Sequence, residues 1–228
     1  MKLSKQILVI SPHADDEILG CGGTIAKHLS ENDIVTIVIC TNGNIGAPEI
    51  FSKKYINDLR KEALLSHKKL GSIKTIFLDF PAPKLDTYPS YKIADKLSLI
   101  IKKIKPNIIY LPFPGDLHND HRCIHNAGLV ASRTNKNNFI EKILLYEVLS
   151  ETECSSIVSH LPFKPNFFVD ISKFLSKKLK AMKEYQSQLK KYPNSRSLET
   201  IESLSKFRGS SVNLKNAEAF MIERIIKK

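Results

Sequence analysis

The chain has 228 residues, of which 42% are hydrophobic and 25% are charged, a balance typical of a globular protein with a sizeable buried core. No stretch reaches the roughly 18–20 apolar residues that a membrane-spanning helix needs. The apolar run at residues 7–10 is too short for a secretory signal, and the four cysteines are scattered without the spacing of a disulfide framework. We therefore expect a cytoplasmic protein without a membrane span.

The net charge of +12 is distributed unevenly along the chain. Residues 171–228 contain 14 Lys and Arg against 5 Asp and Glu, whereas residues 1–170 contain 21 against 18. Such an excess can attract nucleic acid or an anionic membrane surface. Aromatic residues do not alternate with these charges as they do in base-stacking surfaces, so we expect a solvated Lys-rich surface and no nucleic-acid partner. A basic protein that binds nucleic acid or a membrane surface is kept as an alternative.

Short apolar runs alternate with segments of helical length, which favours an α/β fold with a mostly parallel sheet and helices on both faces. The pattern predicts strands at 6–10, 34–40, 74–78, 107–111, 142–147 and 166–170. It predicts helices at 17–29, 52–70, 91–104, 120–132 and 171–191, then a helix or a mixed segment near 198–226. We expect one domain over 1–228, with a core of strand order 3-2-1-4-5 over about 1–170 and a helical carboxy-terminal region over about 171–228.

Two clusters of acidic residues and histidines follow the first and fourth predicted strands. The first is Ser11-Pro-His-Ala-Asp-Asp-Glu17 and the second is Asp116-Leu-His-Asn-Asp-His121. In a doubly wound sheet of this order the two strands are neighbours, and ligands bind in the crevice at their carboxyl ends. Histidine and carboxylate ligands suit a zinc-like ion with an open coordination position. The two clusters together therefore predict metal-assisted hydrolysis.

In the first cluster, we expect His13 and Asp16 to bind the metal and Asp15 to act as general base beside a bound water. Taken alone, consecutive aspartates at the start of a helix are equally well explained by capping and compensation of the helix dipole. Residues 20–23, Gly-Cys-Gly-Gly, do not satisfy the spaced fingerprint of a dinucleotide-binding loop, and we interpret these glycines as sites of close helix–sheet packing.

In the second cluster, His121 is expected to complete a His-Asp-His metal site. We expect His118 to lie beside that site as an acid, with Asp120 orienting and charging its imidazole so that it faces developing negative charge. His125 follows His121 by one helical turn, a spacing that can chelate zinc, and it is kept as an alternative ligand.

These motifs resemble those of the LmbE-like, PIG-L-type de-N-acetylases, whose signatures are His-Pro-Asp-Asp-Glu after the first strand and a later His-x-Asp-His. The resemblance covers nearly the whole chain. The matching segments are Pro12–Gly23, Leu59–Ala63 with Leu70-Gly71, His118–His121, Tyr146–Val148, Tyr185–Gln188, Phe207–Gly209 and Ala217–Phe220.

The resemblance implies a Rossmann-like enzyme that removes acetyl from an N-acetylglucosaminyl or related amino-sugar conjugate, a small-molecule substrate. It implies Zn²⁺ as cofactor, with Fe²⁺ or another divalent metal possible, and a possible homo-oligomer. Arg60 matches a substrate-contacting position, and Asp86 lies in a loop that resembles a substrate-side segment. The family's roles otherwise coincide with those above: metal ligands His13, Asp16 and His121, general base Asp15, and His118 at the oxyanion supported by Asp120.

The chain departs from the family pattern at two positions. Ala14 stands where proline is usual, and Cys154 ends a segment that often ends in tryptophan, a residue absent from this chain. The second departure points to a different substrate. A metal-binding module without turnover and a hydrolase of another bond, such as a phosphoester, are the further alternatives.

Overall fold

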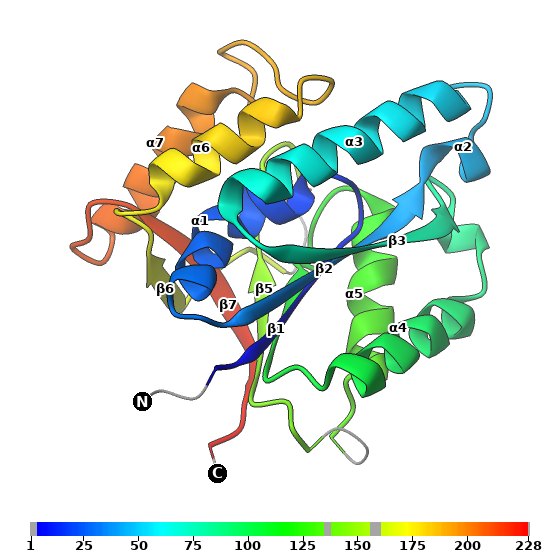
Figure 1. Cartoon of the computed structure of the whole chain (residues 1–228), viewed down its shortest axis with the longest axis horizontal. Coiled ribbons are helices and arrows are strands. Elements are labelled where there is room, and N and C mark those ends of the chain that lie inside the picture. Colours follow the sequence, from blue (N-terminus) through cyan, green and yellow to red (C-terminus); the bar gives the residue numbers. More distant parts are fainter. Residues whose placement is uncertain (1–3, 135–137, 156–160, 228) are drawn as a thin grey trace.

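The computed structural model describes residues 4–134, 138–155 and 161–227, and its centre is a seven-stranded sheet of order β3-β2-β1-β4-β5-β7-β6 (Figure 1). The first five strands pair in parallel, whereas β7 runs antiparallel to both β5 and β6. The predicted α/β class and the 3-2-1-4-5 core order are confirmed. The strands are β1 Gln6–Ser11, β2 Ile34–Asn42, β3 Ile73–Pro81, β4 Ile108–Pro112, β5 Lys142–Tyr146, β6 Phe167–Asp170 and β7 Ala217–Ile225.

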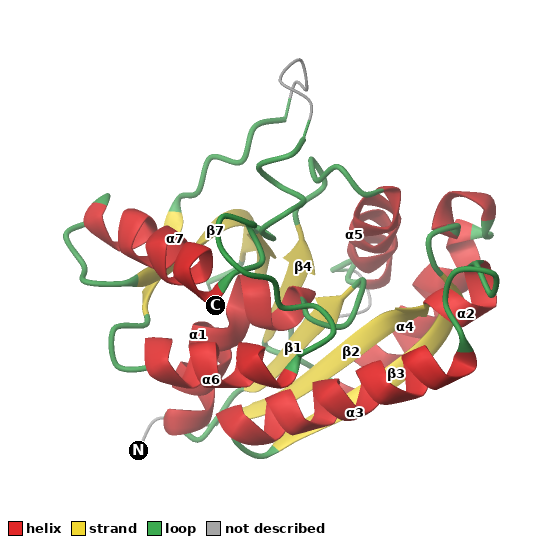
Figure 2. Ribbon diagram, turned by 90° about the horizontal axis from the view of Figure 1, so that it is seen from above, coloured by secondary structure: helices red, strands yellow, loops and turns green. Residues whose placement is uncertain are grey.

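Helices cover both faces of the sheet, as Figures 1 and 2 show. Helices α1, α3 and α6 pack on one face and α4 and α5 on the other. None of the described helices is long and apolar enough to cross a membrane. The helices are α1 Asp16–Ser30, α2 Gly43–Gly46, α3 Lys53–Leu70, α4 Ser90–Ile104, α5 Asn119–Ala131, α6 Leu175–Glu184 and α7 Leu198–Ser210, with a 3₁₀ turn η1 at Leu85–Thr87.

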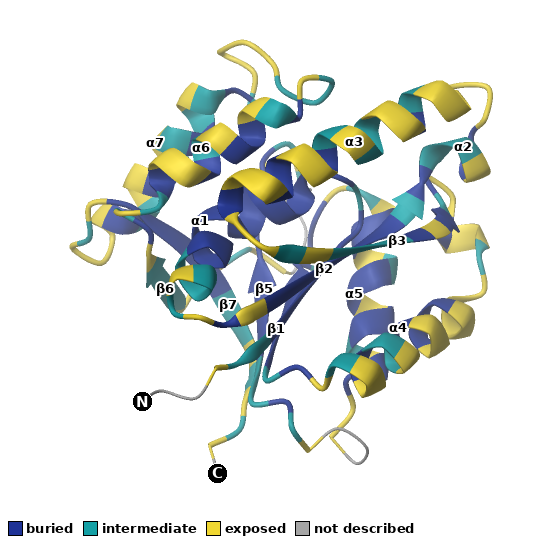
Figure 3. Ribbon diagram, in the orientation of Figure 1, coloured by how far each residue is buried: buried dark blue, intermediate teal, exposed yellow. Residues whose placement is uncertain are grey.

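Strand β1 lies at the centre of the core and contributes to both of its halves. Ile7 and Val9 point into the half beneath α1, α3 and α6, whereas Leu8 and Ile10 point into the half beneath α4 and α5. This alternation follows from the two-residue period of a strand. All four residues are inaccessible to solvent, and Figure 3 shows most of β1 in the colour of buried residues. The loop that follows β1 is therefore held by a rigid, fully packed strand.

The carboxy-terminal region is helical only in part. The segment near 198–226 is the mixed alternative, because α7 is followed by β7, which inserts between β5 and β6. The predicted helix 171–191 is shorter than expected and ends at Glu184. The next side chain, Tyr185, is fully buried and donates a hydrogen bond to Glu17 at the start of α1, so the chain turns inward there instead of continuing as a helix.

Candidate active site

The loop between β1 and α1 brings Asp15 to the carboxyl edge of the sheet in an unusual backbone conformation. Its φ of 111° lies in a region that residues with a side chain rarely adopt. The loop is held internally, because the Ser11 hydroxyl donates to the His13 carbonyl at 2.6 Å and the Asp15 amide donates to Glu17 Oε2 at 3.1 Å. Strain of this kind persists where surrounding contacts enforce it, and it is frequent at functional sites.

Glu17 is the buried anchor of this loop. Besides the Asp15 amide, its carboxylate accepts hydrogen bonds from the Ser11 hydroxyl at 3.1 Å and the Tyr185 hydroxyl at 2.5 Å, and it lies 3.1 Å from Nε2 of His67. A buried carboxylate is stable only when its oxygens are paired in this way. The sequence pattern alone indicates no role for Glu17, although this residue belongs to the first motif.

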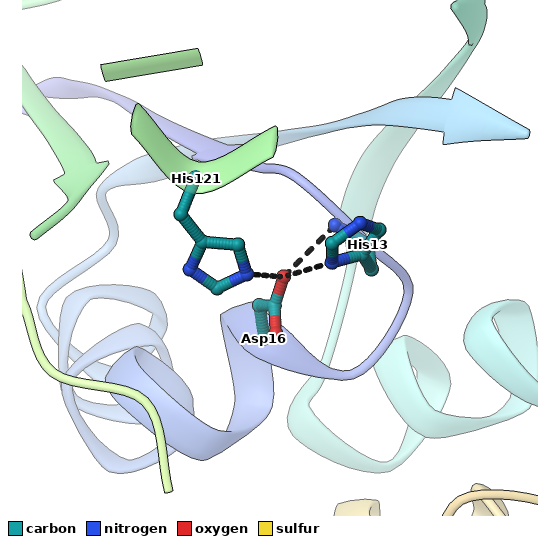
Figure 4. A group of neighbouring side chains, drawn as sticks. All are labelled: His13, Asp16 and His121. Carbon is teal, nitrogen blue, oxygen red and sulfur yellow. Dashed lines mark hydrogen bonds and ion pairs between the residues drawn. The ribbon is translucent and has the colours of Figure 1, made fainter. Parts of the chain in front are cut away.

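His13, Asp16 and His121 form a group that could hold a metal ion (Figure 4). Oδ2 of Asp16 lies 3.4 Å from Nδ1 of His13 and 3.2 Å from Nε2 of His121, and it accepts a hydrogen bond from the His13 amide at 2.9 Å. Asp16 and His121 are fully buried. Among the described residues, Oδ1 of Asp16 and Nε2 of His121 have no hydrogen-bond partner. Because such atoms are costly to bury, this donor set fits a divalent metal of the zinc type.

Each histidine of this group has a second carboxylate on its other ring nitrogen. Nδ1 of His121 lies 2.8 Å from Oδ2 of Asp116, and Nε2 of His13 lies 3.0 Å from Oδ2 of Asp120. Metal-binding histidines characteristically have such partners, which fix the ring orientation. Burial opposes the charge on both rings, but the carboxylates outweigh it and raise the pKa of His13 to about 9 and that of His121 to about 10.

The carboxylate of Asp120 lies between two histidines: its Oδ2 is 3.0 Å from Nε2 of His13 and 3.9 Å from Nδ1 of His118. Nδ1 of His118 accepts a hydrogen bond from the Asp120 amide at 3.1 Å, as the N-cap of α5. A neutral ring therefore carries its proton on Nε2. Burial and the nearby His13 lower the pKa of His118 to about 4, although the charge of Asp120 opposes this shift, and this favours a neutral ring.

A cavity of about 210 Å³ opens beside these residues. Its wall carries Asp15, His13 and His118 together with an apolar surface from α3 and the strands beside it. Arg60 also lines the cavity; it is paired with Asp79 and its guanidinium lies 5.0 Å from the centre of the Phe77 ring. The apolar surface comprises Ile39, Phe51, Tyr55, Ile56, Leu59 and Phe77.

Besides the buried residues Asp16, Asp120 and His121, three further positions named from the sequence lie outside this cavity wall. Asp86 is exposed on η1, where its carboxylate accepts a hydrogen bond from Asn119 at 3.5 Å. His125, the alternative ligand, is absent from the metal-binding groups of the described chain, and Nδ1 of its ring lies 3.0 Å from the Pro112 carbonyl. Cys154 is exposed and is not among the cavity residues.

Arg196 is a cavity residue that the sequence patterns did not indicate. Its guanidinium nitrogen lies 3.1 Å from Oδ2 of Asp15, a carboxylate with only 1% of its surface exposed. Burial raises the pKa of Asp15, although the charge of Arg196 opposes this shift. No motif marks Arg196, whereas Asp116 could have been recognised as a partner of His121 from its place in the second cluster.

Comparison with known proteins agrees with this architecture. Residues 8–132 match the family model PIG-L, GlcNAc-PI de-N-acetylase. The chain is 31% identical to the Uncharacterized deacetylase YaiS of Escherichia coli over 192 residues, 80% of this chain and 91% of YaiS. It is 30% identical to the diacetylchitobiose deacetylase of Thermococcus kodakarensis over 190 residues, 81% of this chain and 70% of that protein.

Among solved structures, the N,N'-diacetylchitobiose deacetylase of Pyrococcus horikoshii matches with a TM-score of 0.75 and 26% identity, over 96% of this chain and 84% of that one. The fold and the site thus define an α/β protein of the LmbE-like type with a candidate histidine–aspartate metal site. The chain belongs to the PIG-L family of de-N-acetylases.

Proposed function

We propose that the protein is a metal-dependent de-N-acetylase that hydrolyses the acetamide of an N-acetylglucosamine-type or related amino-sugar conjugate. The observation that carries this proposal is the position of His13, which belongs both to the candidate metal group and to the cavity wall that holds Asp15 and His118. Family membership and the names of the relatives, which include deacetylases of N-acetylated sugars, support it.

We propose zinc as the metal, held by His13, Asp16 and His121, with iron(II) as a second ion that suits the same nitrogen and oxygen donors. A zinc ion in such a site lowers the pKa of a bound water and polarises a carbonyl group. Asp116 and Asp120 would orient the two histidines through the contacts already described.

In this proposal Asp15 is the general base, since it adjoins Asp16 in the chain and lies in the cavity wall. It takes the proton of the attacking water and returns it to the leaving amine. His118 donates a hydrogen bond from Nε2 to the developing oxyanion, a role that suits a neutral ring whose Nδ1 is already occupied. Arg60, at the cavity wall, contacts the part of the substrate beyond the acetamide.

Acetate release from N-acetylglucosamine, diacetylchitobiose and nucleotide-linked N-acetyl sugars tests the proposal. Zinc-loaded protein should release acetate, chelated protein should lose this activity, and Asp15→Asn should be slower by about 10²–10⁴-fold. Asp58→Asn is the matched control, because Asp58 is exposed on α3 and pairs with Lys61. Release that persists after chelation or in Asp15→Asn contradicts the mechanism. If the protein binds zinc stoichiometrically but releases acetate from none of these substrates, the result favours a metal-binding module without turnover.

A further inference from the structure

Arg196 reaches the candidate active site from a loop far along the chain. It lies in the segment 185–197 between α6 and α7, and its guanidinium makes four contacts. Nη1 lies 3.1 Å from Oδ2 of Asp15 and donates to Oε1 of Gln188 at 3.2 Å. Nε donates to the Ser150 hydroxyl at 2.8 Å, and Nη2 lies 3.8 Å from Glu151. The guanidinium thus joins the loop after β5, the loop after α6 and the loop after β1.

The chain around Asp15 buries three consecutive carboxylates, and each has its own kind of partner. Asp16 lies between two histidines, and Glu17 accepts hydrogen bonds from hydroxyl and amide groups. Asp15 is 1% exposed, and the guanidinium of Arg196 is the cation within ion-pair distance of its Oδ2, an atom without a hydrogen-bond donor among the described residues. A buried carboxylate without a partner is strongly unfavourable, so this guanidinium is suited to fixing the orientation of the Asp15 side chain, while Glu17 holds its backbone amide.

The loop that carries Arg196 is held by hydrogen bonds at both of its ends. At its start, the Tyr185 hydroxyl donates to Glu17, and Nε2 of Gln188 donates to the Tyr55 hydroxyl on α3 at 2.7 Å. At its end, Ser197 caps α7 by accepting a hydrogen bond from the Thr200 amide. A guanidinium held by a fixed loop is suited to holding another side chain in one orientation.

We propose that Arg196 is a positioning residue for the reaction. It holds Oδ2 of Asp15, so that Oδ1 is the oxygen left to take the proton of the attacking water. This inference rests on the proposed function, because it assigns Arg196 a part in the same proton transfer. The rival is direct contact between Arg196 and the substrate, since Arg196 also lines the cavity.

Steady-state kinetics separate the two roles. A misplaced catalytic group costs about 10²-fold in rate, so Arg196→Ala should lower kcat and kcat/KM together by about that factor, with zinc content unchanged. Added guanidinium ion at non-denaturing concentration should restore part of the rate. The kcat of Arg196→Lys should lie between that of Arg196→Ala and that of the unmodified protein. A lysine has no planar group that can contact Asp15 and Ser150 at the same time. A raised KM with unchanged kcat would overturn the inference.

The control is Lys191→Ala, which removes a positive charge from an exposed position of the same loop and should leave both constants unchanged. A second measurement does not depend on turnover: the melting temperatures of Asp15→Asn, Arg196→Gln and the double variant. If Arg196 and Asp15 are coupled, the melting temperature of the double variant should fall by less than the sum of the two single decreases. Decreases in melting temperature that simply add would overturn the inference. If the unmodified protein releases no acetate, the proposed function fails, and this cycle still decides whether Arg196 holds Asp15.

Discussion

Nδ1 of His121 lies 2.8 Å from Oδ2 of Asp116, and both side chains are fully buried. Asp116 is held in turn by the Thr152 hydroxyl, which donates to its Oδ1 at 2.6 Å. These contacts turn Nε2 of His121 towards Asp16, from which it is 3.2 Å distant. The second cluster therefore supplies both a candidate ligand and the group that orients it.

Asp116→Asn is expected to weaken zinc binding by about 10–100-fold, because the amide cannot hold the imidazole as the carboxylate does. Competition with a chromophoric chelator measures this affinity. Asp95→Asn, at an exposed position of α4, is the matched control and should bind zinc as the unmodified protein does. Equal affinities for Asp116→Asn and the unmodified protein would show that Asp116 does not support the site.

Metal binding is expected to release protons. Without metal, His13 and His121 have pKa values of about 9 and about 10, so both rings are protonated at pH 7. A metal binds only the neutral imidazole, and zinc therefore displaces these protons. Raising the pH removes the competing protons, so the apparent zinc affinity should increase between pH 6 and pH 8. Calorimetry in buffers of different ionisation enthalpy measures the release, and a heat that is the same in every buffer contradicts it.

Tyr185→Phe is expected to destabilise the fold by about 1–3 kcal/mol, because it removes a hydrogen bond from the buried carboxylate of Glu17. The free energy of unfolding in urea measures this loss. Tyr91→Phe is the control, since Tyr91 is 63% exposed on α4. Similar stabilities for the two variants would mean that the remaining partners of Glu17 suffice.

The buried pair of Lys178 and Glu218 makes a further prediction about stability. Lys178 Nζ lies 2.6 Å from Glu218 and also donates to the Leu19 carbonyl, so the pair joins α6, β7 and α1. Lys178→Met leaves the carboxylate without its cation and should cost about 3–5 kcal/mol.

The double variant Lys178→Met with Glu218→Gln should recover part of this loss in the same urea unfolding experiment, because it leaves no buried charge unpaired. If the two single losses simply add, the lysine and the glutamate do not act as a pair.

Local patterns in the sequence were sufficient to predict the core of the fold. Apolar runs of strand length alternate with amphipathic helices, and this alternation leads to a parallel sheet because each strand must be covered on both faces. The pairing of β1 with β4 then brings the two histidine clusters together, since both follow the carboxyl ends of neighbouring strands. The meeting of His13 and Asp16 with His121 was therefore predictable from motif position and topology.

Only the tertiary structure decided which partner each side chain takes. Asp120 pairs with His13, 107 residues away, although His118 is its neighbour in sequence. β7 enters the sheet between β5 and β6, and Arg196 reaches Asp15 from a loop without a recognisable motif. Such contacts join segments distant in the chain, and they depend on how the packed helices and strands orient each side chain. The local periodicity of the sequence does not determine that orientation, so these partners can be identified only from the complete fold.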